Sequence, residues 1–244
     1  MSPATDRERL IATIATLLDG VRHVAVGASS PIPAAGAMLR RALDARRGRN
    51  VRISILGSAR HNFFTNGSAE LFDCAAQGRI DAFFLGGGQI DGKGNINLVG
   101  AGDYPRSSPR WPGSFGSGLL YYVVPRVILF REEHSLRVFV ERVDFVSAAG
   151  TSDPVVHRTG GPHALITSLA LFRFDRERRR FVLQEIHPEH GLDDIRARTG
   201  FGFDCAADLR RTPDPDAATL ALIRGQVFDE LAESYPQFVG TVRG

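Results

Sequence analysis

The sequence predicts an α/β fold with an open, mainly parallel sheet that has helices on both faces. Short continuous apolar runs alternate with helical patterns along the N-terminal third of the chain, and turn residues separate them. Apolar runs joined by helices are typical of parallel strands buried on both faces. The chain has 244 residues, 43% of them hydrophobic and 23% charged, so we expect one large globular domain over residues 1–244.

The first element is expected to be an amphipathic helix. Thr5 and Glu8 have the spacing of a capping box, and apolar residues then follow a helical period until Gly20. A buried strand is predicted at 22–27, followed by a loop and a second helix at 34–48. These elements form one complete β-loop-α repeat.

The remaining strands follow the same signals. They are predicted at 51–56, 80–85, 126–130, 164–172 and 181–186, with a helix at 68–78. The densest basic run, residues 172–181, lies between the last two strands. We interpret it as the solvated tip of a hairpin rather than as a DNA-binding patch.

Glycines gather where ligands bind in such a sheet, at the carboxyl ends of the strands. Gly86, Gly87 and Gly88 directly follow a strand that must be buried. Glycine costs backbone entropy on folding, so three in a row indicate a close approach to the backbone or a positive φ. They suggest a binding site, whereas residues 91–95 are explained by a tight hairpin turn.

The sequence lacks the motifs that are typical of several classes of protein. The glycines of residues 113–118 stand in the wrong order for a dinucleotide fingerprint, and the chain has neither a Walker A motif nor a G-x-S-x-G nucleophile elbow. Cys74 and Cys205 have no partner at CxxC spacing. We expect no metal site and no permanently bound cofactor.

One histidine-rich segment has a spacing that could suggest metal ligands. Its candidate residues are His187, His190, Asp193 and Asp194. Proline and glycine interrupt the backbone between them, and the two aspartates suit the first turn of a helix, where carboxylates complement the helix dipole. The helix interpretation is the preferred one.

Charge and hydropathy exclude two kinds of partner. The formal net charge is +3, with 30 basic and 27 acidic residues, and no nucleic-acid recognition motif appears. No apolar stretch approaches the roughly 18 residues needed to cross a bilayer, and the N-terminus lacks the apolar region of a signal peptide. We expect a cytoplasmic protein that binds neither nucleic acid nor membrane.

An ordered set of segments resembles the beta subunit of class I CoA-transferases, particularly the glutaconate CoA-transferase type. The segments are "FFLGGGQIDGKGNIN" (83–97), "WPGSFGSG" (111–118), "HSLRVFVERVDFVSAAG" (134–150) and "EIHPEHGLDDIRARTGF" (185–201). The resemblance implies the CoA-transferase or sugar-isomerase-like fold and an enzyme of catabolism. It also implies an alpha-type partner chain, in a heterodimer or heterotetramer, and a coenzyme A thioester as substrate.

The resemblance also implies where acyl-CoA is bound. The expected substrate-binding residues are Ser58, Gly86, Gly87, Gly88, Gln89, Gly113, Ser114 and Gly116. The family's small residues at 86–89 line the active site, where they let the thioester arm pass near the backbone.

The chain departs from the family pattern at the nucleophile. Class I transferases carry a glutamate in a short Ser-Glu-x-Gly stretch after a strand, and it attacks the thioester. When Ser58 is matched to that serine, Ala59 stands in place of the glutamate, and residues 57–62 contain no acid. The catalytic residue is therefore left unassigned. His61 is a weak candidate acid or base, with an exposed loop histidine as the alternative.

Two other functions stay open beside CoA transfer. The chain is also similar to the beta subunit of the hydrolase that opens the last ring in bacterial steroid degradation, which acts on a cyclic CoA thioester with a glutamate from its alpha subunit. That similarity lies in residues 137–147 and in the His187-Pro188 pair. A chain that keeps the fold without the nucleophile could also be a regulatory subunit, because fold does not fix function.

Overall fold

The chain divides into two compact units, which we describe separately. The computed structural model describes residues 2–243. The first unit contains the residues up to Cys74, the segment Arg79–Phe84 and the residues from Pro213 onward. The second unit contains Ala75–Gly78 and Leu85–Thr212. The single domain over residues 1–244 stays a prediction.

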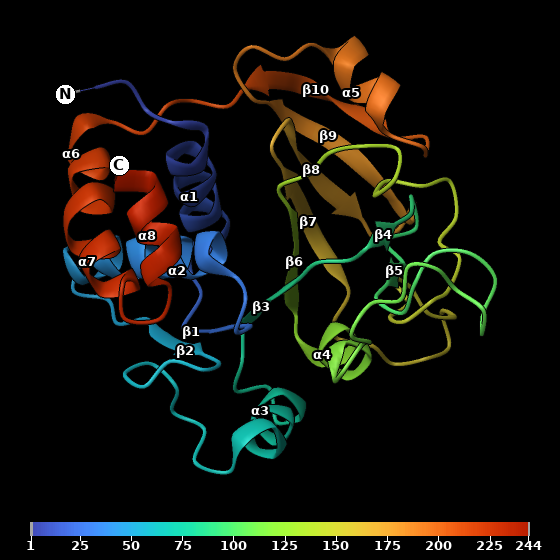
Figure 1. Cartoon of the computed structure of the whole chain (residues 1–244), viewed down its shortest axis with the longest axis horizontal. Coiled ribbons are helices and arrows are strands. Elements are labelled where there is room, and N and C mark those ends of the chain that lie inside the picture. The colour runs from blue at the N-terminus through green and yellow to red at the C-terminus, as the bar shows by residue number, and fades with distance from the viewer. Residues whose placement is uncertain (1, 244) are drawn as a thin grey trace. The chain divides into compact units, whose positions relative to one another are not determined.

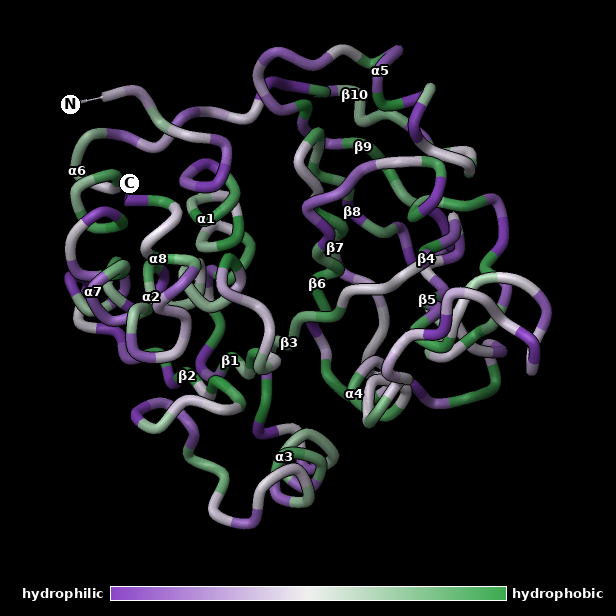
Figure 2. Tube along the Cα trace, in the orientation of Figure 1, coloured by the Kyte–Doolittle hydropathy of each residue, from purple (hydrophilic) through white to green (hydrophobic). Residues whose placement is uncertain are grey.

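Three parallel strands form the centre of the first unit. β1 (His23–Val26) lies between β2 (Arg52–Ile55) and β3 (Ala82–Leu85) and pairs in parallel with both. Every residue of β1 and β3 is buried, and Figure 2 shows hydrophobic residues along both strands. The three strands lie where the sequence predicted them, which confirms the parallel α/β pattern of this part of the chain.

Helices cover the strands of the first unit on both sides. They are α1 (Asp6–Leu17), α2 (Pro31–Ala45), α3 (Gly67–Ala76), α6 (Ala217–Leu222), α7 (Phe228–Leu231) and α8 (Pro236–Arg243), with a π-helical segment η1 (Ile223–Val227) between α6 and α7. Figure 1 shows α3 on one side of β1 and β2 and the other helices gathered on the opposite side. α2 begins three residues before its predicted start, because proline is well tolerated in a first helical turn, where the missing N–H would be unpaired anyway.

The capping box of α1 is confirmed. The Glu8 backbone N–H donates to Thr5 Oγ1 at 3.3 Å, and the Thr5 backbone N–H donates to Glu8 Oε2 at 2.8 Å. α1 then crosses α2 very closely. A Cβ atom added to Gly36 would lie 2.3 Å from Ile14 Cγ2 and 2.7 Å from Ile14 Cβ, so this crossing depends on the absence of a side chain at Gly36.

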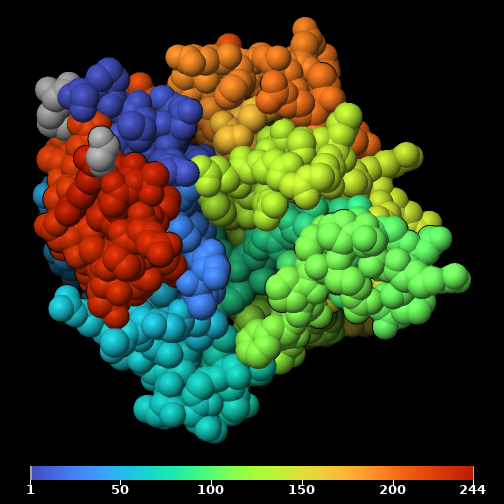
Figure 3. Space-filling view, viewed as in Figure 1, coloured from blue at the N-terminus to red at the C-terminus, as the bar shows by residue number. Residues whose placement is uncertain are grey.

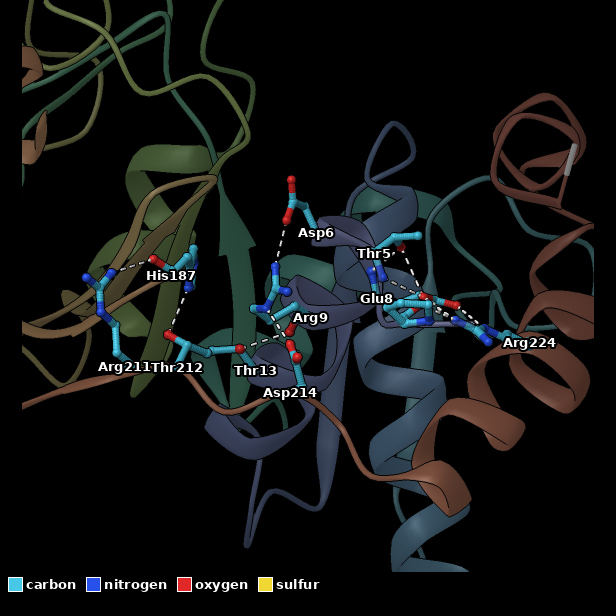
Figure 4. A network of polar contacts seen from close by, with 11 residues as sticks. Thr5, Asp6, Glu8, Arg9, Thr13, His187, Arg211, Thr212, Asp214 and Arg224 are labelled. Carbon is cyan, nitrogen blue, oxygen red and sulfur yellow. Dashed lines mark hydrogen bonds and ion pairs between the residues drawn. The ribbon is translucent and has the colours of Figure 1, made fainter. Parts of the chain in front are cut away.

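The C-terminal segment returns to the N-terminal helix (Figure 4). The Arg224 guanidinium donates to both oxygens of the buried Glu8 carboxylate, at 2.6 and 2.9 Å. Burial opposes ionisation of Glu8, but the hydrogen bonds from Arg224 and Thr5 outweigh it and lower the pKa of the carboxyl. Arg9 forms an ion pair with Asp214, with Nε 2.9 Å from Oδ1. Figure 3 shows the red C-terminal segment beside the dark blue α1, so both ends of the chain build the first unit.

The second unit is built on five neighbouring strands of mixed direction. Its strands are β6 (Arg126–Arg131), β7 (Pro162–Thr167), β8 (Ala170–Asp175), β9 (Arg180–Ile186) and β10 (Asp204–Arg211), and they lie side by side in sequence order. β6 pairs with β7 and β9 with β10 in parallel, whereas β8 is antiparallel to both of its neighbours. Parallel pairings outnumber antiparallel ones over the strands of the two units, so the mainly parallel α/β class is confirmed.

The prediction of one strand at 164–172 is wrong, because the segment forms two antiparallel strands. β7 ends at Thr167, whose Oγ1 accepts the backbone N–H groups of Leu169 and Ala170 at 3.1 and 3.2 Å. Only two polar residues, Thr167 and Ser168, separate the apolar runs of the two buried strands, so the hydropathy pattern marks the turn weakly. The predicted hairpin tip is confirmed, with residues 176–179 exposed between β8 and β9.

The histidine-rich segment is held by ordinary structural contacts. The His187 ring contacts Thr212 Oγ1 at 2.8 Å and the Thr167 carbonyl at 2.9 Å. Asp194 accepts the Gly191 backbone N–H at 2.8 Å at the start of α5 (Leu192–Arg198), which confirms the helix interpretation. Within residues 2–243 no group of three or more metal-ligating side chains is arranged to hold an ion, and no helix is long and apolar enough to cross a membrane.

Candidate active site

The loop after β2 folds into a tight turn around Ser58. Gly57 adopts a φ of 87°, a conformation that favours glycine, and Ser58 is only 5% exposed. The Ser58 Oγ accepts the backbone N–H groups of Arg60 at 3.2 Å and His61 at 2.9 Å. The turn is therefore closed by the side chain at its own first position.

A carboxylate from the C-terminal segment occupies this turn. The Ser58 hydroxyl donates to Glu233 Oε2 at 2.7 Å, and the Ala59 backbone N–H donates to Glu233 Oε1 at 2.8 Å. The Ser234 hydroxyl donates to the same carboxylate at 2.5 Å. These hydrogen bonds, Ser234 first, lower the pKa of Glu233 to about 2. The position expected for the family nucleophile thus holds Ala59, whose backbone N–H donates to a glutamate with a lowered pKa.

His61 faces a second carboxylate of the same segment. Its Nε2 lies 2.8 Å from Glu230 Oε1, although the pair lacks the angles of a hydrogen bond, and Arg41 also forms an ion pair with Glu230. The hydroxyl of Ser58 is directed instead to Glu233. Its one proton is already donated, so the arrangement does not pair His61 with Ser58 as base and nucleophile.

Glu70, the first acid after the loop, is also committed to a structural role. Its carboxylate accepts the Asn66 backbone N–H at 3.0 Å and the Thr65 hydroxyl at 2.9 Å at the start of α3. The hydrogen bond from Asn66 is the main reason that the pKa of Glu70 is lowered. This carboxylate therefore stabilises the beginning of a helix.

Other parts of the chain pack closely against each of the three glycines after β3. A Cβ atom at Gly86 would lie 3.1 Å from the Phe130 carbonyl oxygen, and one at Gly87 would lie 2.7 Å from Ile96 Cγ2. At Gly88 it would lie 2.3 Å from the Trp111 ring. Atoms of the chain itself therefore lie close to the backbone at all three positions.

Gln89 belongs to a closed hydrogen-bond network. Its Nε2 donates to Asp144 Oδ2 at 2.8 Å, and its Oε1 accepts Asn97 Nδ2 at 2.8 Å and the Asp144 backbone N–H at 3.0 Å. Gln89 starts the short strand β4 (Gln89–Ile90), which pairs with β5 (Ile96–Asn97). The turn between them confirms the hairpin interpretation of residues 91–95.

The second glycine-rich loop lies against the first. The Gly88 backbone N–H donates to the Asn97 carbonyl at 2.9 Å, and the Gly113 backbone N–H donates to the Leu98 carbonyl at 3.1 Å. Ser114 and Gly116 lead into α4 (Ser117–Val123). The structure thus brings together residues 86–89 and 113–116 in the second unit, while Ser58, Ala59 and His61 belong to the first unit.

We expect Gly88→Ala to displace the Trp111 indole, because the added methyl group would overlap the ring. Trp111 is the only tryptophan in the chain, so its fluorescence emission should shift and its near-UV circular dichroism should change. Gly118→Ala is the control. A Cβ atom there has its nearest contact at 3.5 Å, and alanine favours the helix. Unchanged tryptophan spectra in Gly88→Ala would contradict the observed packing.

Two candidate functional residues could not be identified from the sequence. Glu230 and Glu233 reach the loop after β2 from far along the sequence, as the 175-residue separation of Ser58 and Glu233 shows. Their spacing of three residues was the one available signal, since it places both carboxylates on one side of a helical turn. Nothing in the sequence indicates which loop they meet.

Known proteins resemble the chain over much of its length. The B subunit of glutaconate CoA-transferase from Acidaminococcus fermentans is 29% identical over 151 residues, which are 59% of this chain and 56% of that protein. The B subunit of 3-oxoadipate CoA-transferase from Pseudomonas knackmussii is 29% identical over 153 residues, 60% of this chain and 58% of that protein. The matches thus span less than two thirds of either relative.

Solved structures share the fold over nearly the whole chain. The crystal structure of the decarboxylase AibA/AibB superimposes with a TM-score of 0.76 and 25% identity, covering 93% of this chain and 98% of that chain. Residues 11–198, well over half of the sequence, match the family described as coenzyme A transferase. The chain therefore belongs to the coenzyme A transferase family.

Proposed function

We propose that this chain is the beta-type subunit of a heteromeric, cytoplasmic enzyme that acts on an acyl-CoA thioester. The family match over residues 11–198 supports the assignment. Two relatives are named as B subunits of CoA-transferases, and a third protein is named with two components, AibA and AibB. An alpha-type chain is accordingly the proposed partner, and the residues at 58, 86–89, 113, 114 and 116 remain the proposed acyl-CoA contacts.

We further propose that the partner supplies the catalytic carboxylate. The observation that carries this proposal is the loop after β2, where Ala59 replaces the expected glutamate. The nearby Glu233 carboxylate accepts hydrogen bonds from Ser58, Ala59 and Ser234. A carboxylate held by these donors, with its pKa near 2, is a weak nucleophile. This favours a hydrolase-type reaction on the acyl-CoA, with a glutamate from the partner, over ordinary CoA transfer through this chain.

Covalent trapping tests the proposal directly. The complex with its alpha-type partner is incubated with glutaconyl-CoA or 3-oxoadipyl-CoA as probes, treated with borohydride or hydroxylamine, and mapped by mass spectrometry. We expect thioester consumption with no label on this chain. A label on Glu70, Glu233 or another carboxylate of this chain would support ordinary CoA transfer through this chain. Absence of any thioester consumption would favour a regulatory role.

Ala59→Glu provides a positive control for the trapping experiment. Ala59 is exposed, so a glutamate side chain has room at this position. If the loop keeps the family's geometry, the new carboxylate should become labelled in the same complex. A variant that is labelled while the natural chain is not would show that the trap works and that the missing carboxylate is the reason.

A further inference from the structure

The turn at residues 58–60 presents two hydrogen-bond donors to one carboxylate. The Ser58 hydroxyl and the Ala59 backbone N–H each bind a different oxygen of Glu233, at 2.7 and 2.8 Å. Successive donors that converge in a turn make an anion-binding concavity. We infer that residues 58–60 form a carboxylate-binding site at the end of β2, and that Glu233 is its resident occupant and the positioning residue of this loop.

The hydrogen bonds of the Ser58 and Glu233 side chains indicate that Glu233 holds the turn in place. Ser58 uses its single proton on Glu233 and accepts two backbone N–H groups through its oxygen. The Glu233 Oε2 accepts the hydroxyls of both Ser58 and Ser234. Removing the carboxylate would leave the Ala59 N–H and the Ser58 hydroxyl without their acceptor, and the turn would lose its connection to the C-terminal segment.

Neighbouring residues of the same segment brace the adjoining loops. Glu230 forms an ion pair with Arg41 of α2 and lies beside His61, and the Tyr235 hydroxyl donates to the Gly27 carbonyl at 3.1 Å. Gly27 follows β1 and His61 follows β2. Residues 230–235 therefore contact the loops at the carboxyl ends of both strands, which are the edge where such sheets bind ligands.

Amide hydrogen exchange on the full-length chain tests this inference without acyl-CoA. In Glu233→Ala we expect exchange at residues 59–61 to rise by about tenfold or more, because charge-assisted hydrogen bonds protect this turn. Exchange at residues 86–89 should not change. Glu233→Gln, which keeps one acceptor oxygen, should show an intermediate increase. Glu177→Ala, at an exposed carboxylate of the hairpin tip, is the matched control and should leave the turn unchanged.

Acetate then distinguishes a binding site from general support of the fold. Acetate replaces the atoms that Glu233→Ala removes, so it should restore slow exchange at residues 59–61, whereas sodium chloride at equal concentration should not. Equal protection by both salts, or no response to acetate, would refute the carboxylate site. Unchanged exchange in Glu233→Ala would refute the positioning role. Neither result would bear on the proposed activity, since no thioester is used.

Discussion

Gly36→Ala should destabilise the chain, although alanine normally stabilises a helix by about 1 kcal/mol relative to glycine. The new methyl group would lie 2.3 Å from Ile14 Cγ2 and 3.2 Å from the Ile11 carbonyl oxygen. A rotation of Ile14 could not relieve the contact with its Cβ at 2.7 Å, so α1 and α2 must separate. Overpacking of this kind costs about 1–3 kcal/mol, measurable by urea unfolding.

Two variants control this measurement. Gly240→Ala in α8 places a methyl group where no atom lies within 4 Å, and it should be neutral or stabilising. Ile14→Ala should destabilise by itself through the cavity it leaves. Combined with Gly36→Ala, however, it should cost less than the sum of the two single changes. Strict additivity would show that the two residues do not contact each other as observed.

The unfolding free energy should fall as the pH is lowered from 6.5 towards 4, because His134 is buried in its neutral form. Burial first, and then the positive charge of Arg198, lower the pKa of His134 to about 4. The unfolded chain takes up the proton near pH 6.5, so it binds more protons than the folded chain within this window. The stabilisation from His134 is complete above pH 6.5. About 3 kcal/mol of it is lost on approaching pH 4.

The contacts of His134 provide the control. Its ring lies between Thr167 Oγ1 at 2.8 Å and Thr199 Oγ1 at 2.9 Å. His134→Asn keeps a polar side chain and removes the titration, so it should flatten the dependence of the unfolding free energy on pH between 5 and 7. His163, whose pKa burial also lowers to about 4, should leave part of the slope in place. Identical slopes in the variant and the natural chain would contradict the prediction.

Local signals in the sequence predicted local structure well. Thr5 and Glu8 predicted the start of α1, and the buried strands of the first unit were found from continuous apolar runs. The same signal failed at 164–172, because only Thr167 and Ser168 separate the two apolar strands at the turn. Hydropathy records burial, and it does not record the direction of the chain.

The candidate site was predicted in part, for a related reason. Glycine at 86–88 correctly indicated a close approach, and the structure identifies protein atoms that make it, including the Trp111 ring. Whether acyl-CoA also passes there stays a prediction. The Glu233 contact could not be predicted, because it joins residues far apart in sequence and depends on the fold as a whole.

The division of the first unit between both ends of the chain has a consequence for synthesis on the ribosome. The strands of the second unit lie within Leu85–Thr212, so that unit is translated as almost one continuous segment. The loop after β2 emerges before the second unit, whereas the residues that brace it, 230–235, follow that unit in the sequence. A nascent chain must therefore carry this turn without its carboxylate until the whole second unit has been made, so the turn can reach its braced conformation only after that.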